Sequence, residues 1–429
     1  MSAATLSPRA RYAVLFAAIG GLMFDGVELG LMPVAALSVS QSLLGNAYTP
    51  TLGGDWFARF TAALMLGAAV GGIFLGSLGD RIGRTRALGI SILFYSVFAG
   101  LGALVRTQEQ MLLLRFLVGL GVGGVWPNAV ALAAECWPDK SRPVVAGLMG
   151  AALNAGILVL SQVARTWHIT PESWRWIFWL AAAPAVLGLL VLFALPESPL
   201  WLAARAARSS LTPSGERAGS RRQPTNQPLR ELFRPPLLRL LVIGILLGSI
   251  PMVGAWAASK WMIPWADTVG GTSAAGYKAV TQGWWALGAM LGSFFGAQIA
   301  AWLGRRRAYA LISAGATALT SLMFLGTAPL QASFLPIVFA QGFVATLFFG
   351  WLPLYLPELF PTRVRAAGSG IAYNVGRFAT AAGVLMAGVL FAAMGGSYPK
   401  VGALCGLIYL LGLIVIWWAP DTSKKQLAE

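Results

Sequence analysis

The sequence is poor in charged residues and in the residue types that usually build enzymatic or metal sites. Only 11% of its 429 residues are charged, whereas about a quarter are charged in ordinary soluble proteins. It has a single histidine, His168, and its two cysteines, Cys136 and Cys405, lie far apart, so we expect neither a metal site nor a disulfide framework. No Gly-x-x-x-x-Gly-Lys sequence that would hold a nucleotide phosphate occurs. The sequence therefore predicts no soluble enzyme, no cofactor and no ATP-driven process.

Long apolar runs dominate instead. Hydrophobic residues make up 57% of the chain, and the mean hydropathy is +0.71. A helix needs about 20 consecutive apolar residues to cross a bilayer. Such runs lie at residues 11–36, 58–79, 86–106, 109–134, 143–164, 175–195, 238–260, 279–303, 308–327, 331–354, 366–393 and 400–419. The first is too long and too interrupted by polar residues for a cleaved signal, so the sequence predicts an all-α membrane protein with twelve transmembrane helices.

The basic residues are unevenly distributed along the chain. The formal net charge of +16 raises the alternative of a nucleic-acid-binding protein. With a cytoplasmic N-terminus, however, 22 of the 31 basic residues fall on the inner side, and only seven, Lys260 among them, fall outside or at outer helix ends. Lysine and arginine in short loops favour the cytoplasmic side. We therefore expect a bacterial inner-membrane protein with both termini in the cytoplasm, surrounded by lipid and binding no nucleic acid.

A polar segment divides the twelve runs into six and six. Residues 203–236 are rich in Arg, Ser, Pro and Gln, a composition typical of a solvated, poorly ordered linker. The sequence therefore predicts an N-terminal six-helix bundle at 1–195, a cytoplasmic linker at 196–236 and a C-terminal six-helix bundle at 237–429.

The two predicted bundles repeat each other. Glu135 after the fourth run and Glu358 after the tenth both begin the pattern Glu-x-aromatic-Pro-x-x-x-Arg. Gly67 and Gly71 match Gly288 and Gly292 at a constant offset. Small residues four apart allow helices to approach closely. We expect these glycines to pack the second and eighth helices against neighbours from the opposite half.

Three loop motifs carry a family resemblance. The sequence from Gly76 to Arg86, GSLGDRIGRTR, resembles the major facilitator signature G-x-L-x-D-R-x-G-R-R. With PESPLW from Pro196 and PELFPTRVR from Pro357, the chain resembles sugar porters, organic-ion transporters and aromatic-acid/proton symporters. The resemblance implies two pseudo-symmetric six-helix bundles and a charge network that latches the cytoplasmic ends together. We assign this gating role to Asp80, Arg81, Arg84, Glu135, Arg142, Glu358 and Arg365.

Two acidic residues lie inside the predicted membrane helices. Asp25 and Glu28 are three residues apart on the first helix, so they share one face. Arg115 on the fourth helix lies at a comparable depth. An ionised group in the membrane persists only where protein or water receives it, so we expect Glu28 to pair with Arg115 when ionised. Proton-coupled sugar porters resemble this arrangement, and we assign proton coupling to all three residues. A permanent structural ion pair is the alternative.

Arg377 on the eleventh helix has no acidic residue in its own half to neutralise it. By the repeat it corresponds to Asn154 on the fifth helix, so both should face a central cavity. A guanidinium binds a carboxylate in two-pronged fashion, which favours an anionic substrate; the alternative is a relay with Asp25 or Glu28. The remaining predicted substrate-binding residues are Trp126, Asn128, Trp256, Gln282, Trp285, Gln341, Tyr373 and Asn374.

These observations predict a monomeric secondary active transporter that moves a small organic carboxylate together with protons by alternating access. A proton-coupled neutral sugar symporter would keep the Glu28 and Arg115 pair but not need Arg377. A proton/drug antiporter would use the acids of the first helix for cations.

Overall fold

In the computed structural model, residues 6–136, 142–209, 231–361 and 364–422 are described, and their regular structure is almost entirely helical. Twelve helical segments are long and apolar enough to cross a membrane. The N-terminal six are α1 (Pro8–Leu44), α2 (Pro50–Ile82), α3 (Arg84–Leu101), α4 (Gln108–Cys136), α5 (Arg142–Thr166), and α6 (Arg175–Ala182) with α7 (Ala185–Ala194). The prediction of an all-α membrane protein with twelve transmembrane helices is confirmed.

The second half repeats this order. Its seventh span joins α10 (Leu237–Val253), a π-helical turn η4 (Gly254–Ala258), the short 3₁₀ turn η5 (Ser259–Trp261) and α11 (Met262–Gly270). Then follow α12 (Tyr277–Leu303), α13 (Arg305–Leu325), α14 (Phe334–Leu359), α15 (Arg365–Ala393), and α16 (Tyr398–Gly406) with α17 (Ile408–Trp418). Of the predicted linker, α8 (Pro199–Ser209) occupies the first part, and residues 210–230 lie outside the described residues.

Glycines set the corresponding turns of the two halves. Gly83 between α2 and α3 has φ +113°, and Gly304 between α12 and α13 has φ +84°. These are backbone conformations that side chains disfavour. A Cβ at Gly83 would also lie 2.0 Å from a carboxylate oxygen of Glu197. Gly83-Arg84 and Gly304-Arg305 therefore form the same tight helix-to-helix turn in each half.

The glycines predicted to join the halves instead pack each half internally. A Cβ at Gly67 would lie 2.1 Å from the Phe116 carbonyl of α4, and one at Gly288 would lie 2.2 Å from the Phe339 carbonyl of α14. The prediction of partners in the opposite half was wrong. The physical reason is that α4 presents a matching glycine, Gly119, so both helix surfaces are flat enough for backbone contact.

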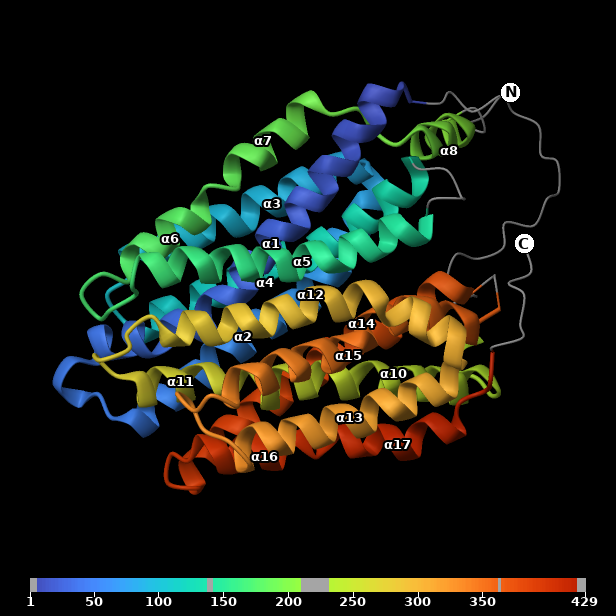
Figure 1. Cartoon of the computed structure of the whole chain (residues 1–429). Helices are drawn as coiled ribbons and strands as arrows, with labels where there is room; N and C mark the ends of the chain where they lie inside the picture. Colours follow the sequence, from blue (N-terminus) through green and yellow to red (C-terminus); the bar gives the residue numbers. More distant parts are fainter. Residues whose placement is uncertain (1–5, 137–141, 210–230, 362–363, 423–429) are drawn as a thin grey trace.

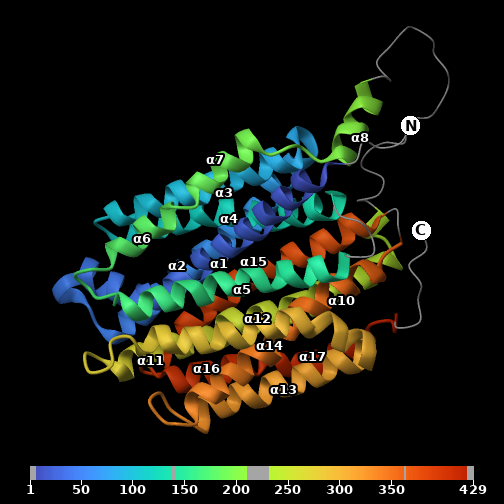
Figure 2. The same cartoon turned by 45° about the horizontal axis from the view of Figure 1, so that its top comes forward.

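The halves lie side by side and meet along two helix pairs, α5 against α12 and α2 against α15 (Figures 1 and 2). The end at which α1 begins and α17 ends is termed the terminal end, and the other the opposite end. Glycines bring the second pair close, since a Cβ at Gly54 would lie 2.1 Å from the ring of Phe391. These two interfaces enclose the space in which the site lies.

Candidate functional site

A cavity of about 340 Å³ lies between the halves, lined by α1, α2, α4 and α5 on one side and by the seventh span, α12, α14 and α15 on the other. This volume is at the lower end of the range of about 300–1,000 Å³ for small-molecule sites. Seven predicted substrate-binding residues line it: Trp126, Asn154, Trp256, Trp285, Tyr373, Asn374 and Arg377.

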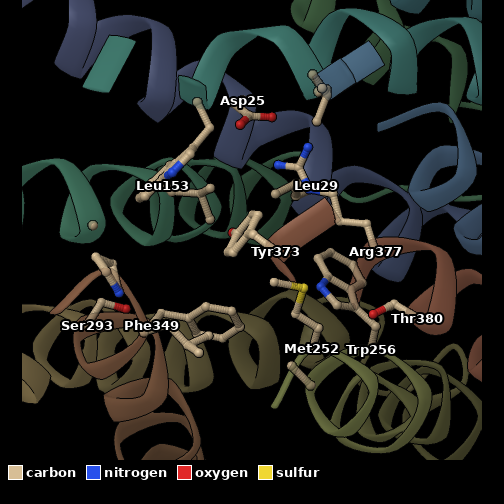
Figure 3. Close-up of a pocket in the computed structure, with 18 of the residues that line it drawn as sticks. Asp25, Leu29, Leu153, Met252, Trp256, Ser293, Phe349, Tyr373, Arg377 and Thr380 are labelled. Carbon is tan, nitrogen blue, oxygen red and sulfur yellow. The ribbon is translucent and has the colours of Figure 1, made fainter. Parts of the chain in front are cut away.

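Arg377 reaches from α15 across the cavity towards Asp25 on α1 (Figure 3). Its Nη1 donates a hydrogen bond to the Ala68 carbonyl at 2.9 Å, and its guanidinium lies 5.3 Å from the centre of the Tyr373 ring. Gly72 leaves room for this arrangement, because a Cβ there would lie 2.9 Å from Nη1. Among the described residues no carboxylate lies within ion-pairing distance of Arg377, so most of its donors remain available to a ligand.

Asn154 lines the same cavity from the other half, as the repeat predicts. Its Nδ2 donates to Ser293 Oγ at 3.0 Å and thereby joins α5 to α12. The two equivalent positions thus differ in kind: Arg377 offers a charge to the cavity, whereas Asn154 is an amide already engaged with the opposite half.

Glu28 and Arg115 form the predicted ion pair. Arg115 Nη2 lies 3.1 Å from Glu28 Oε2, and each side chain is 1% exposed. Asp25, one turn earlier, lines the cavity, and its Oδ1 has no hydrogen-bond partner in the described structure. Close packing fixes this part of α1, since a Cβ at Gly26 would lie 1.8 Å from the Leu153 carbonyl of α5. The two acids therefore have different surroundings: Glu28 is paired, and Asp25 faces the cavity.

Three predicted substrate-binding residues do not line the cavity. Asn128 donates to the carbonyls of Leu75 and Gly124, and thus binds α2 to α4. Gln282 donates to Ser161 across the interface of α12 and α5. Gln341 lies behind the cavity wall and accepts a 2.8 Å hydrogen bond from Trp285 Nε1. The amide nitrogen of each of these residues donates to a neighbouring helix, and such hydrogen bonds offset the cost of burying a polar group.

The structure adds a residue that the sequence interpretation placed at an outer helix end. Lys260 lines the cavity and is 1% exposed. Its Nζ lies 3.4 Å from the centre of the Trp285 ring and 5.6 Å from that of Trp256. The seventh span continues to Gly270, so Lys260 lies inside it. The mostly apolar residues that follow Lys260 in the sequence could have indicated that the seventh span continues beyond it.

The charged residues predicted to form a gate cluster within each half at the terminal end. Arg84 pairs with Asp80 at 2.6 Å and with Glu135 at 3.2 Å. In the second half, Arg305 pairs with Glu358 at 2.8 Å. Arg81 is exposed, Arg365 begins α15, and the side chain of Arg142 lies outside the described residues. In this structure, the described ion pairs of these clusters stay within a half and do not join the two halves.

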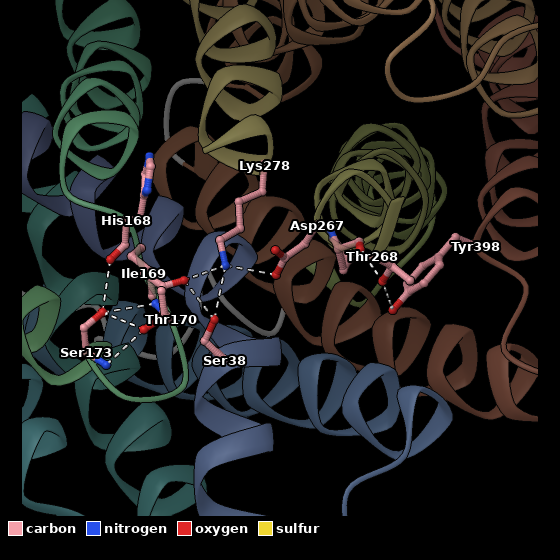
Figure 4. A network of polar contacts seen from close by, with 10 residues as sticks. Ser38, His168, Ile169, Thr170, Ser173, Asp267, Thr268, Lys278 and Tyr398 are labelled. Carbon is pink, nitrogen blue, oxygen red and sulfur yellow. Dashed lines mark hydrogen bonds and ion pairs between the residues drawn. The ribbon is translucent and has the colours of Figure 1, made fainter. Parts of the chain in front are cut away.

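A polar network joins the halves at the opposite end (Figure 4). Lys278 of α12 pairs with Asp267 of α11 at 3.0 Å. The same ammonium donates to Ser38 Oγ of α1 at 3.2 Å and to the Ile169 carbonyl at 3.0 Å. One buried lysine thus joins both halves.

The cavity extends towards the terminal end. Its lining includes Pro357, two residues before α14 ends, and Ser369, four residues after α15 begins. The Lys278 network lies at the other end of the same helices. One end of the bundle is thus joined by polar contacts, and the cavity reaches towards the other end.

Comparison with known proteins agrees with this architecture. Residues 13–429 match the family described as sugar (and other) transporters. The chain is 31% identical over 421 residues to the cis,cis-muconate transport protein of Acinetobacter baylyi, with 96% of each chain covered. It is 30% identical over 369 residues to the probable 4-methylmuconolactone transporter of Cupriavidus pinatubonensis, covering 84% of this chain and 81% of that one.

A solved structure shares the fold. The inward-open xylose transporter XylE of E. coli matches with a TM-score of 0.71 at 18% identity, over 97% of this chain and 98% of that one. The family match covers nearly the whole chain and includes both bundles. The chain therefore belongs to the sugar (and other) transporter family of the major facilitator superfamily and is a multi-pass membrane transporter, not an enzyme.

Proposed function

We propose that this transporter moves a small organic anion together with protons, by alternating access, into a bacterial cell in which both of its termini are cytoplasmic. The main support for the proposal is Arg377, which is half-buried in the central cavity. Among the described residues, it donates its hydrogen bond to a backbone carbonyl and not to a carboxylate. A planar guanidinium with free donors binds a carboxylate strongly and in a defined orientation.

The relatives support an anionic substrate. One is named for cis,cis-muconate and another for 4-methylmuconolactone. When Asp25 is protonated, a neutral sugar would leave the charge of Arg377 without a counter-ion in the closed cavity. That is costly in a medium of low dielectric constant. For this reason we prefer the organic anion over the sugar, and over a cationic drug, which Arg377 would repel.

The proposed coupling uses the two acids of α1. Asp25 faces the cavity near Arg377, while Glu28 pairs with Arg115, and the buried Tyr95 of α3 adds a hydroxyl to the same region. A substrate carboxylate at Arg377 would repel an ionised Asp25. Proton uptake by Asp25 removes that repulsion, so anion and proton bind together more readily than either alone.

Alternating access then requires that the closed end opens while the end that is now open closes. In the proposed orientation the structure is closed to the outside by the Lys278 network and reached from the cytoplasm. Asp80, Arg81, Arg84, Glu135, Arg142, Glu358 and Arg365 would join the halves on the cytoplasmic side when the outer end opens. Rocking of two repeats around a fixed central site is the general mechanism of such folds.

Uptake by proteoliposomes tests the proposal. Radiolabelled cis,cis-muconate should accumulate when the outside is acidic, and a protonophore should abolish the accumulation. Arg377→Gln should lose high-affinity uptake, whereas Arg59→Gln, at an exposed arginine paired with Asp55, should behave as wild type. Unchanged affinity in Arg377→Gln would remove the site assignment, and accumulation that ignores the pH gradient would remove proton coupling.

A further inference from the structure

We propose that Lys260 is a second anion-binding group of the central cavity, so that the preferred substrate carries two negatively charged groups, one for Arg377 and one for Lys260. This inference rests on the proposed organic-anion function and narrows it to dicarboxylates. Both cations line the same cavity.

The Lys260 ammonium has no hydrogen-bond acceptor among the described residues, although its side chain is 1% exposed. An ammonium has three N–H donors, and burying them without acceptors is strongly unfavourable. The Trp285 ring 3.4 Å away offsets part of that cost through a cation–π contact. A ring face accepts no strong hydrogen bond, so the donors still lack an anionic partner.

Lys278 shows how this chain treats a buried lysine with a structural role. Its ammonium, on a side chain that is 4% exposed, has three partners in Ser38, Ile169 and Asp267. Lys260 has the same charge and similar burial but no such partners. The difference is that Lys260 faces the cavity, where a ligand can supply the acceptors.

The seventh span is irregular just before Lys260. Pro251 within α10 removes a backbone donor, and the π-helical turn η4 follows directly. Single π turns within α-helices occur often at functional sites. Gly254 in this turn fits against the ring of Tyr409, where a Cβ would lie 2.3 Å from the ring. The irregular turn is therefore held by packing from α17.

The aromatic partner of Lys260 is also held in place. Trp285 donates to Gln341 Oε1 at 2.8 Å, and Gln341 donates to Ser259 Oγ at 2.6 Å. Ser259 is the residue before Lys260. This chain of hydrogen bonds connects the tryptophan ring to the residue next to the lysine and thus fixes the ring beside Lys260.

The charges of the cavity balance for a dianion. Among the described lining residues, Arg377 and Lys260 are basic and Asp25 is acidic. With Asp25 protonated, a dicarboxylate brings the lining and its ligand to zero net charge. In that protonation state, a monocarboxylate would leave one cation uncompensated. A closed, dry cavity favours neutrality, so the cotransported proton and the second carboxylate depend on each other.

The two cations lie at different depths. Counted at about 1.5 Å per residue from the helix ends at the opposite end, Lys260 is ten residues from Gly270 and Arg377 sixteen from Ala393. Their backbone positions are thus roughly 15 and 24 Å from that end. An elongated ligand with a charge at each end fits this separation better than a compact one.

Binding of cis,cis-muconate and of its monomethyl ester tests the inference, because the ester keeps the carbon chain and removes one charge. Wild type in nanodiscs should prefer the dianion. Lys260→Met should weaken dianion binding about tenfold or more, the value of a charge-assisted hydrogen bond, and leave ester binding nearly unchanged. Lys260→Arg should keep the preference, and Lys400→Met, at an exposed lysine, should match wild type.

The outcomes separate the two proposals. Wild type that binds neither anion overturns the organic-anion function. Wild type that binds both equally, or Lys260→Met that loses both equally, overturns the role of Lys260 alone. Lys260→Met removes an uncompensated charge and should unfold at or above the wild-type temperature; if it does not fold, Lys260→Gln serves in the same comparison.

Discussion

The Glu28 carboxylate and the Arg115 guanidinium lie 3.1 Å apart, and both side chains are almost completely buried. Only Nη2 of Arg115 donates to Glu28, and Nε and Nη1 have no hydrogen-bond partner among the described residues. Each of the two charges is thus compensated by the other. Removing one charge leaves the other buried without compensation, whereas removing both leaves neutral groups of similar size.

Arg115→Met should therefore destabilise the protein by about 3–5 kcal/mol, the usual cost of breaking a buried ion pair. The double variant Glu28→Gln with Arg115→Met should recover most of that loss. Thermal unfolding in detergent measures both. A double variant that is no more stable than Arg115→Met would show that the two charges do not stabilise each other.

Replacing the acids of α1 should separate binding from coupling. Glu28→Gln together with Asp25→Asn removes both candidate proton sites, so anion exchange should continue while uphill accumulation on an imposed pH gradient is lost. The two single variants, Glu28→Gln and Asp25→Asn, identify which acid carries the proton. Counterflow measures exchange, and gradient-driven uptake measures coupling. Accumulation equal to wild type in the double variant would refute the coupling model.

Gly72→Ala should weaken substrate binding without unfolding the protein. Its Cβ would lie 2.7 Å from Asn374 Oδ1 and 2.9 Å from Arg377 Nη1, so both cavity side chains must shift. We expect a rise of about tenfold in KM, as for one lost charged hydrogen bond. Gly150→Ala is the matched control, since its nearest contact is an ordinary 3.8 Å and it lines the same cavity. Equal KM values in the two variants would argue against this explanation.

Lys278→Met should weaken closure at the opposite end. It removes the donors that bind Ser38 and Ile169 of the first half, a loss that shifts the open population about tenfold or more. The ring of Phe57 contacts Trp261 of the other half, so Phe57→Cys reports opening at this interface. Its labelling by a maleimide, in a background without Cys136 and Cys405, should rise in Lys278→Met and stay constant in Lys400→Met. Unaltered labelling would mean that the Lys278 network does not keep this end closed.

Much of the architecture could be predicted because hydropathy, loop charge and the repeated Glu-x-aromatic-Pro pattern are local features of the sequence. The pairing of Glu28 with Arg115 followed from depth alone, since few buried charges exist to satisfy one another. Their function in proton coupling stays a prediction.

What could not be predicted depends on neighbours distant in sequence. Gln282 and Gln341 resemble ligand-binding amides until Ser161 and Ser259 are seen beside them. Lys260 was misplaced because hydropathy alone ended the seventh helix at the charge, whereas Trp265 and its neighbours carry the span to Gly270. A composition window cannot tell a lysine that ends a helix from one that faces a cavity.

The π-helical turn at Gly254–Ala258 has a consequence for how relatives are aligned with this chain. A π turn holds one residue more than the regular turn it replaces, and the span absorbs that residue without a break. Loss of a single codon in this stretch would therefore restore regular helix and leave the later residues on the faces they occupy now. In a relative without the π turn, a lysine on the face of Lys260 would stand one position away from it in a residue-by-residue count.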